Sequence, residues 1–313
     1  MDVLSVDVLS DVVATLRTGE PRSARVAWRA PWGQRFPGAP GAGFQVILRG
    51  SCWLVPDSGE PLRLAAGDVL FLPRGHGHAL ADHPGTPLAE PRCEPLAGPY
   101  TGPYTGAETG ARAEPDTVTL CGAYQLDPVH AHPLLRDVPD VLHLAARPGR
   151  HPELRAAVGL LAGELESPRP GAAAVVPALL DTLLMFILRA WSERSADGPE
   201  HGWAAALADP ALGRALQAVH AEPGRSWTVG TLAAEAGLSR AAFARRFTAA
   251  VGRPPLGYVT WWRMALATRL LRDSDLPLGV LAARVGYTSE FAFSHAFKRH
   301  HGLAPGRYRS ASA

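Results

Sequence analysis

A tandem repeat of about fifty residues, which lies beyond residue 205, constrains this chain more than any other feature. The first copy reads TVGTLAAEAGLSRAAFARRF and the second reads LGVLAARVGYTSEFAFSHAF. The matched residues are Leu232, Ala233, Gly237, Phe243, Phe247, Gly252, Pro255 and Tyr258 in the first copy, and Leu281, Ala282, Gly286, Phe293, Phe297, Gly302, Pro305 and Tyr308 in the second. The offset is 49 residues up to the glycine at the turn and 50 after it. Self-similarity of this kind indicates one supersecondary unit present twice.

Each copy predicts two helices joined by a sharp turn. Gly237 and Gly286 can adopt the left-handed conformation that ends a helix and reverses the chain. A hydroxyl side chain then caps the next helix, Ser239 in the first copy and Thr288 or Ser289 in the second. The two matched phenylalanines of each copy are four residues apart, so they share a helix face and can anchor the second helix to the first.

The second helix of each copy keeps an outer face whose residue types suit DNA. Arginine, lysine, histidine and glutamate side chains contact base edges or phosphates when a helix lies in a major groove. The predicted DNA-binding residues are Ser239, Arg240, Ala241, Arg245, Arg246, Ser289, Glu290, His295, Lys298 and Arg299. A protein-binding solenoid is the structural alternative, but solenoids need about three repeats or more.

The charge of the chain is divided between its two parts. Residues 201–313 contain 14 Lys or Arg and 6 Asp or Glu, a net charge of +8, while the 17 basic and 23 acidic residues of 1–200 give −6. A basic part binds polyanions favourably, because neutralised phosphates release counterions. We therefore expect double-stranded DNA as the partner of residues 201–313, the alternative being a merely solvated basic surface.

Over about residues 210 to 310, the chain resembles the AraC/XylS family of bacterial transcriptional regulators. The run VLAARVGYTSEFAFSHAFKRHHGLAPGRYR closely follows the family signature, and WWRMALATRLLRDSDLP resembles the helix that joins the two units. The resemblance implies base contacts at Arg240, Ala241 and Arg245, then at Glu290 and His295, and RNA polymerase as a further partner. Glu290 would either accept from a cytosine amine or repel a phosphate.

The first 130 residues read as short strands interrupted by Gly and Pro, which indicates a β-rich domain. The run from Gly67 to His78, GDVLFLPRGHGH, resembles the second motif of cupins and places His78 at a metal-ligand position. The first cupin motif lacks its histidines and glutamate, since that strand reads FQVI with Gln45. His76, His78 and Cys121 remain candidate ligands of zinc or another divalent metal, although we favour polar residues at a barrel rim.

The three cysteines of the chain suggest a second way to sense a signal. Cys52, Cys93 and Cys121 are too few for a disulfide framework, which favours the cytoplasm. Cys93 and Cys121 form a candidate redox pair, because thiol oxidation can bias a two-state regulator. A small-molecule effector inside the barrel fits the sequence equally well.

Residues 134–200 have the spacing of two helices. The second of them, from about Val175 to Glu193, is apolar on nearly every side. It must pack inside the chain or against a second copy, so a homodimer is one expectation. The most apolar stretch, Val175–Leu188, is too short to span a bilayer and contains Pro177 and Asp181, so we expect no membrane segment. The acidic start MDVLSVDVLSDVV does not predict export either.

Together these observations predict an α+β protein: a cupin-like β-barrel at 1–133, a helical segment at 134–200 that dimerises, and an all-α domain at 205–313 with helix-turn-helix units near 229–250 and 278–300. The expected function is a transcriptional regulator, not an enzyme, whose barrel senses a small molecule, a metal or an oxidant. The rival interpretation is a metal-dependent cupin enzyme fused to a DNA-binding tail.

Overall fold

The computed structural model describes residues 7–16, 19, 21–38, 41–56, 59–89, 104–105, 114–126, 132–196 and 202–312. These residues form two compact units. The sheet unit comprises residues 17–131 and 135–193, and the helical unit comprises residues 1–16, 132–134 and 194–313. The division differs from the predicted boundaries, because the first helix of the chain belongs to the helical unit and residues 135–193 belong to the sheet unit.

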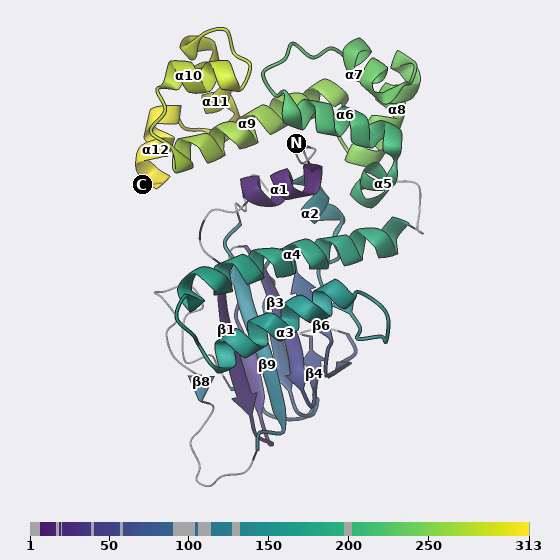
Figure 1. Cartoon of the computed structure of the whole chain (residues 1–313), viewed down its shortest axis with the longest axis vertical. Helices are drawn as coiled ribbons and strands as arrows, with labels where there is room; N and C mark the ends of the chain where they lie inside the picture. The colour runs from purple at the N-terminus through teal and green to yellow at the C-terminus, as the bar shows by residue number, and fades with distance from the viewer. Residues whose placement is uncertain are drawn as a thin grey trace. The chain divides into compact units, whose positions relative to one another are not determined.

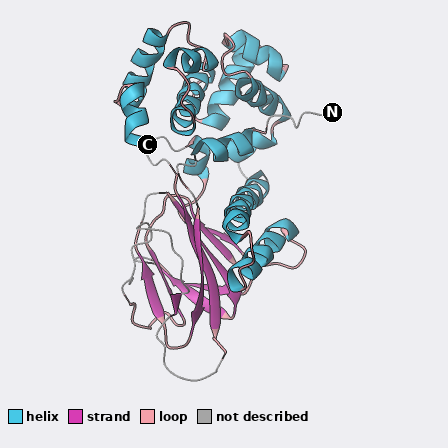
Figure 2. Ribbon diagram, turned by 60° about the vertical axis from the view of Figure 1, so that its left-hand side comes forward, coloured by secondary structure: helices cyan, strands magenta, loops and turns pink. Residues whose placement is uncertain are grey.

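The strands of the sheet unit form two sheets (Figure 2). The larger sheet has the order β10-β6-β3-β9-β1-β8 and the smaller one β2-β7-β4-β5. The bounds are β1 Arg22–Trp28, β2 Gly33–Phe36, β3 Ala42–Arg49, β4 Ser51–Val55, β5 Leu62–Ala65, β6 Val69–Leu72, β7 His78–Ala81, β8 Tyr104–Thr105, β9 Thr117–Tyr124 and β10 Leu142–Leu144. Among these described strands, every pairing is antiparallel except that of β1 with β8.

The core of this unit lies between the two sheets. Strands of both sheets contribute large apolar side chains to one cluster, including Trp28 on β1, Leu64 on β5 and Leu80 on β7. The turn from β3 to β4 depends on Gly50, which has φ +75° and whose Cβ, if present, would overlap the carbonyl oxygen of Asp116. The predicted β-rich domain is therefore confirmed as a cupin-like pair of sheets.

Three helices follow the strands in the chain: α2 Pro133–Asp137, α3 Pro152–Glu166 and α4 Ala172–Ala196. Figure 1 shows α3 and α4 beside the larger sheet. The buried Tyr124 hydroxyl of β9 donates to the carbonyl oxygen of Leu180 on α4, 2.8 Å away, which joins that helix to the sheet. This contact explains why residues 135–193 share a unit with the strands.

Helix α4 is longer than the sequence suggested. It has 25 residues, because it extends beyond Val175–Leu188 at both ends. Pro177 and Asp181, which lie within that stretch, do not interrupt it. Among the described residues it is the one helix long and apolar enough to cross a membrane, by length and composition. The expectation that this stretch is too short was therefore wrong, but a buried core helix passes the same test.

The helical unit contains α1 and α5 to α12. Their bounds are α1 Val8–Leu16, α5 Trp203–Ala208, α6 Pro210–Ala221, α7 Val229–Ala236, α8 Arg240–Val251, α9 Pro255–Asp273, α10 Leu278–Arg284, α11 Glu290–His301 and α12 Pro305–Ser312. Figure 1 shows α9 running between two groups of helices, α5 to α8 at one end and α10 to α12 at the other. The predicted linker helix is α9, where Met264 and Leu271 are buried and Leu266 and Leu270 pack beside them.

Candidate DNA interface

The first helix-turn-helix unit consists of α7 and α8. Thr228 and Thr231 form a capping box at the start of α7, and Gly237 ends that helix with φ 68° and ψ 30°. Two residues later the Ser239 hydroxyl accepts from the backbone N–H of Ala242 at 3.3 Å and caps α8. Phe243 is fully buried, as the anchor role predicted. The turn, cap and anchor expected from the sequence are confirmed in this copy.

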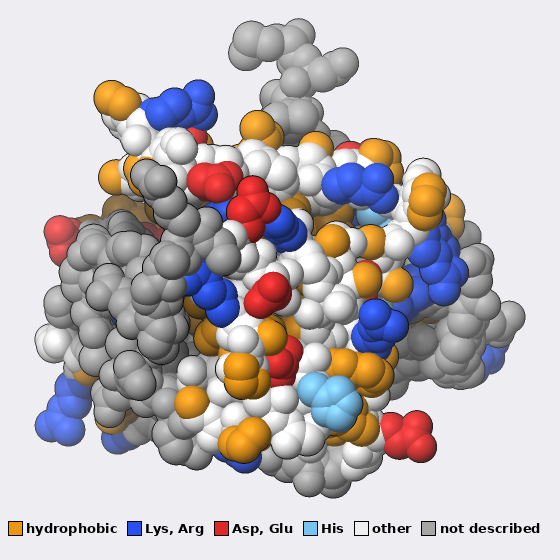
Figure 3. Space-filling model, turned by 90° about the horizontal axis from the view of Figure 1, so that it is seen from below, with side chains coloured by type: hydrophobic (Ala, Val, Ile, Leu, Met, Phe, Trp, Pro, Cys, Tyr) orange, Lys and Arg blue, Asp and Glu red, His pale blue; other side chains and the backbone are white. Residues whose placement is uncertain are grey.

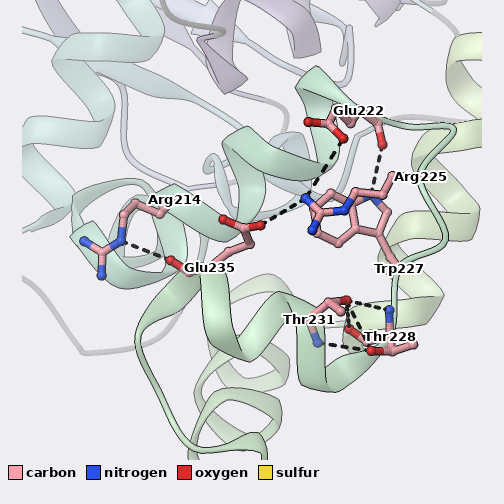
Figure 4. Close-up of polar contacts among 7 residues, drawn as sticks. All are labelled: Arg214, Glu222, Arg225, Trp227, Thr228, Thr231 and Glu235. Atoms are coloured by element: carbon pink, nitrogen blue, oxygen red, sulfur yellow. Dashed lines mark hydrogen bonds and ion pairs between the residues drawn. The ribbon is translucent and has the colours of Figure 1, made fainter.

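Two arginines fix α7 in place, as Figure 4 shows. Arg214 of α6 donates from Nε to the carbonyl oxygen of Glu235 at 3.1 Å and from Nη2 to that of Ala236 at 2.9 Å. These carbonyls end a helix and lack helical partners, so the guanidinium satisfies them. Arg225 pairs with the Glu235 carboxylate at 3.0 Å and lies over the Trp227 ring, 4.3 Å from its centroid. Side chains outside the repeat, Arg214 and Arg225, therefore hold α7 in position.

The second unit, α10 and α11, repeats the design. Gly286 takes φ +79° in the turn, and the Ser289 hydroxyl accepts from Ala292 N–H at 3.1 Å, so Ser289 rather than Thr288 is the cap. Phe293 and Phe297 are completely buried in a cluster that also includes Met264 of α9. In the first unit Phe247 of α8 packs edge-on against Tyr258 of α9, with ring centroids 5.8 Å apart, so both units pack against the same long helix.

The predicted contact residues differ in what their side chains do within the chain. Arg240, Ala241 and Arg245 on α8, and Glu290, His295, Lys298 and Arg299 on α11, are exposed. The two serines are helix caps, which uses their hydroxyl oxygens as acceptors within the chain. Arg246 pairs with Asp209 at 2.5 Å, and Asp209 itself caps α6. Arg246 therefore stabilises the unit, and its contact with DNA stays a prediction.

Sequence reasoning missed a histidine–aromatic cluster inside the helical unit. His220 of α6 stacks on Trp262 of α9 at 3.8 Å and lies 2.8 Å from the Tyr258 hydroxyl. Its other ring nitrogen lies 3.1 Å from the carboxylate of Asp11 on α1. Burial lowers the pKa of His220, so the neutral ring donates to Asp11 and accepts from Tyr258.

His132 completes that cluster from a different part of the chain. Its ring packs edge-on against Trp203 and Trp261, with centroids 4.4 and 4.8 Å away. Its Nδ1 accepts from Leu134 N–H, and burial holds the pKa of His132 well below the ordinary value. No local pattern places residues 11, 132 and 220 together, so the sequence did not predict a packing role for these histidines. The signal was the richness in Trp and His of segments far apart in sequence.

The sheet unit does not assemble the predicted metal group. His78 Nε2 lies 3.0 Å from Gln45 Nε2, and burial lowers the pKa of His78 to about 4, so the amide donates to a neutral ring. His76 instead faces Asp140 at 3.5 Å, and the Cys121 thiol donates to the carbonyl of Ala24. Among the described residues, no three His, Cys, Asp or Glu side chains could hold one metal ion.

The structure describes one of the two cysteines of the predicted redox pair, Cys121. Cys93 lies outside the described residues. Burial raises the pKa of Cys121 to about 11 and that of Cys52 to about 12. Thiols with such pKa values are protonated near neutrality, and the thiolate is the form that reacts. Cys121 therefore has the character of a packing residue.

The charged side chains on the two predicted recognition helices are mostly basic. On the face that Figure 3 shows, acidic and basic side chains are interspersed with apolar ones. The outer faces of α8 and α11 carry one acidic side chain, Glu290, among the predicted contact residues. Such a mixture of arginine, lysine and histidine on two exposed helices suits phosphate contacts.

Comparisons with known proteins agree with this geometry. The family described as Cupin matches residues 7–193, and the family described as Helix-turn-helix domain matches residues 232–311. A putative AraC-like transcription regulator of Streptomyces antibioticus is 37% identical, covering 97% of this chain and 98% of that protein. The HTH-type transcriptional regulator AlkR of Acinetobacter baylyi is 29% identical over 98% of this chain and 100% of its own length.

Among solved structures, the DNA-binding domain of AdpA, in complex with a target DNA, is 36% identical, with a TM-score of 0.31. That match covers 33% of this chain and 92% of the AdpA domain. The chain pairs a cupin domain with two helix-turn-helix units, and it is similar over nearly its whole length to proteins named as AraC-like regulators. It belongs to the AraC-like family of transcription regulators.

Proposed function

We propose that α8 and α11 lie in successive major grooves on one side of the duplex and read two different half-sites. The observation that supports this proposal is how the two helices are held. Both are capped, both pack against α9, and each has an exposed outer face. In helix-turn-helix proteins the second helix of each unit is the one that enters the groove. Arg245 and His295 occupy matching positions, so the two half-sites differ in sequence.

Phosphate contacts supply most of the affinity in this proposal. Among the described residues, the side chains of Arg240, Arg245, Lys298 and Arg299 are exposed, and none of the four forms an ion pair of the kind that holds Arg246. Their charges are therefore available to phosphates, unlike those of Arg225 and Arg246. Each neutralised phosphate steepens the loss of affinity with salt.

The test is binding of the full chain to a duplex selected from a random pool, at several salt concentrations. We expect the binding constant to fall steeply with salt, and Arg245→Ala to weaken binding and relax base preference in one half-site. Arg63→Ala, which removes an equal charge from an exposed position on β5, is the matched control and leaves binding unchanged. Salt-insensitive binding, or equal losses in both variants, contradicts the proposal.

We propose that the sheet unit controls DNA binding. The protein then acts in the cytoplasm and catalyses no reaction. The core cluster between its sheets is apolar, and Gln45 with His78 adds a polar pair to the unit. A small organic effector is favoured over an oxidant, because burial raises the pKa values of both described cysteines, Cys52 and Cys121. A bound metal remains testable by elemental analysis of purified protein. Substoichiometric metal is expected, whereas one iron, nickel or zinc per chain that is lost in His78→Ala supports the cupin-enzyme alternative.

We also propose a homodimer through α3 and α4 and a contact with RNA polymerase. Leu160 on α3 and Val175 on α4 are exposed apolar side chains, which suits an interface between copies. Sedimentation of the full chain is expected to give a dimer, and Leu160→Asp is expected to shift it toward monomer. A monomer at all concentrations contradicts the dimer proposal and leaves the proposal for DNA unaffected.

A further inference from the structure

One large apolar side chain stands on the outer face of the second recognition helix. Phe291 of α11 is 83% exposed, the highest value among the large hydrophobic residues that the structure describes. The other phenylalanines of the same helix, Phe293 and Phe297, are fully buried. Exposing an aromatic ring to water is unfavourable, and a ring on a binding surface indicates a partner with an apolar group.

The position of Phe291 is that of a base-reading residue. It is the second residue of α11, directly after Ser289 caps the helix and Glu290 opens it. The N-terminal residues of a recognition helix are those that contact base edges. His295 is four residues further on, so it shares the outer face with Phe291, and Lys298 follows within the next turn.

Glu290, the residue before it, has its carboxylate near the first turn of α10. A Cβ placed on Gly279 would lie 3.6 Å from Glu290 Oε2, so this carboxylate lies against the first turn of α10. Glu290 remains an exposed predicted contact residue, and Phe291 is the large apolar side chain exposed in the first turn of α11.

The chemistry of the major groove names the target. Each base pair presents hydrogen-bond donors and acceptors there, and thymine adds an apolar group, its 5-methyl. A phenylalanine has no donor or acceptor for the polar edges, so the methyl group is its complement. We propose that Phe291 contacts the 5-methyl group of a thymine in the half-site read by α11.

This contact is specific to the second half-site. Counting from the capping serines, the residue of α8 that corresponds to Phe291 is Ala241. The methyl of Ala241 is exposed but small, so it covers far less of a thymine methyl than a phenyl ring does. The inference rests on the proposed DNA binding and adds a base to it, together with the residue that selects that base.

The experiment replaces thymine by uracil, which removes the 5-methyl group and leaves base pairing intact. The wild-type full chain is titrated with the selected duplex and with probes that carry one dT→dU change at each thymine in turn. At one position in the second half-site we expect affinity to fall about four-fold, the worth of one buried methyl group. Phe291→Ala is expected to lose at least as much affinity for the thymine probe and to bind both probes equally.

Leu62→Ala is the control, since it truncates another exposed apolar side chain, 36% exposed on β5, outside the helix-turn-helix units and outside the proposed dimer surface. It is expected to keep the uracil effect in full. Phe291→Ala that still distinguishes thymine from uracil overturns the inference, as does an equal response of the wild type to every uracil probe. Absence of any salt-dependent DNA binding by the wild type is a different result, because it overturns the proposed function itself.

Discussion

His220 Nδ1 lies 3.1 Å from Asp11 Oδ2, which joins the first described helix of the chain to the interior of the DNA-binding unit. The His220 side chain is completely buried, whereas Asp11 is partly exposed. The contact spans 209 positions in sequence, so α1 is a structural part of the helical unit although it precedes the cupin strands.

Removing this acceptor is expected to destabilise the helical unit. Asp11→Ala leaves a buried ring N–H without a partner, which costs about 1–3 kcal/mol. Urea unfolding followed by tryptophan fluorescence measures the change, because Trp262 stacks on His220. Asp275→Ala, an exposed aspartate in the segment after α9, is the control and leaves the unfolding free energy unchanged. Equal stability of the two variants would show that the contact contributes nothing.

Acid is expected to destabilise the same unit. The pKa values of His132 and His220 are lowered by burial in the folded state, so below about pH 6.5 the unfolded chain binds more protons than the folded one. The free energy of unfolding therefore falls as pH drops from 6.5, by at most about 1.4 kcal/mol per pH unit for each ring. Comparing urea unfolding at pH 7.5 and 5.5 tests this, and His132→Phe is expected to flatten the slope. A stability that rises toward pH 5.5 contradicts it.

Replacing the glycine in the turn of the second unit is expected to destabilise the protein more than replacing the glycine that ends its second helix. Gly286 and Gly302 have similar positive φ values, 79° and 76°, but their surroundings differ. A Cβ on Gly286 would lie 2.7 Å from Arg263 Nη2 and 2.9 Å from the carbonyl oxygen of Gly224, while one on Gly302 would meet no described residue within 4 Å beyond its two chain neighbours. Gly302→Ala is expected to cost about 1 kcal/mol from backbone strain alone. Gly286→Ala costs more, and unfolding free energies in the reverse order would refute this.

Cys52 and Cys121 are expected to resist alkylation in the folded protein. Burial raises both thiol pKa values to about 11 or 12, so thiolate is scarce at pH 7.5. Mass spectrometry after iodoacetamide treatment should find both unmodified in buffer and both modified in urea. Fast modification of native Cys121 at pH 7.5 would restore it as a redox candidate.

The sequence predicted best what depends on local chemistry. Glycine turns, serine caps and paired phenylalanines are determined by spacings of a few residues, and Gly237, Ser239 and Phe243 all take the predicted roles. Where two local solutions existed, as with Thr288 and Ser289, packing of the following helix decided between them.

Long-range packing is what the sequence alone did not reveal. Helix α1 is short, and the partner of its Asp11 lies on α6, so no periodicity predicted where it docks. The bond between Gln45 and His78 joins β3 to β7, strands of different sheets, and no local pattern predicted that contact. The sequence pattern did not distinguish Phe291 from the anchors Phe293 and Phe297, whereas its exposure in the folded chain does.

The most direct test of this account is a footprint of the full chain on its selected duplex. We predict two protected segments about one helical turn apart on one side of the DNA. Arg245→Ala should relax base preference in one segment, and His295→Ala should relax it in the other. A single protected segment, or one whose base preference both variants relax together, would contradict the claim that α8 and α11 read separate half-sites.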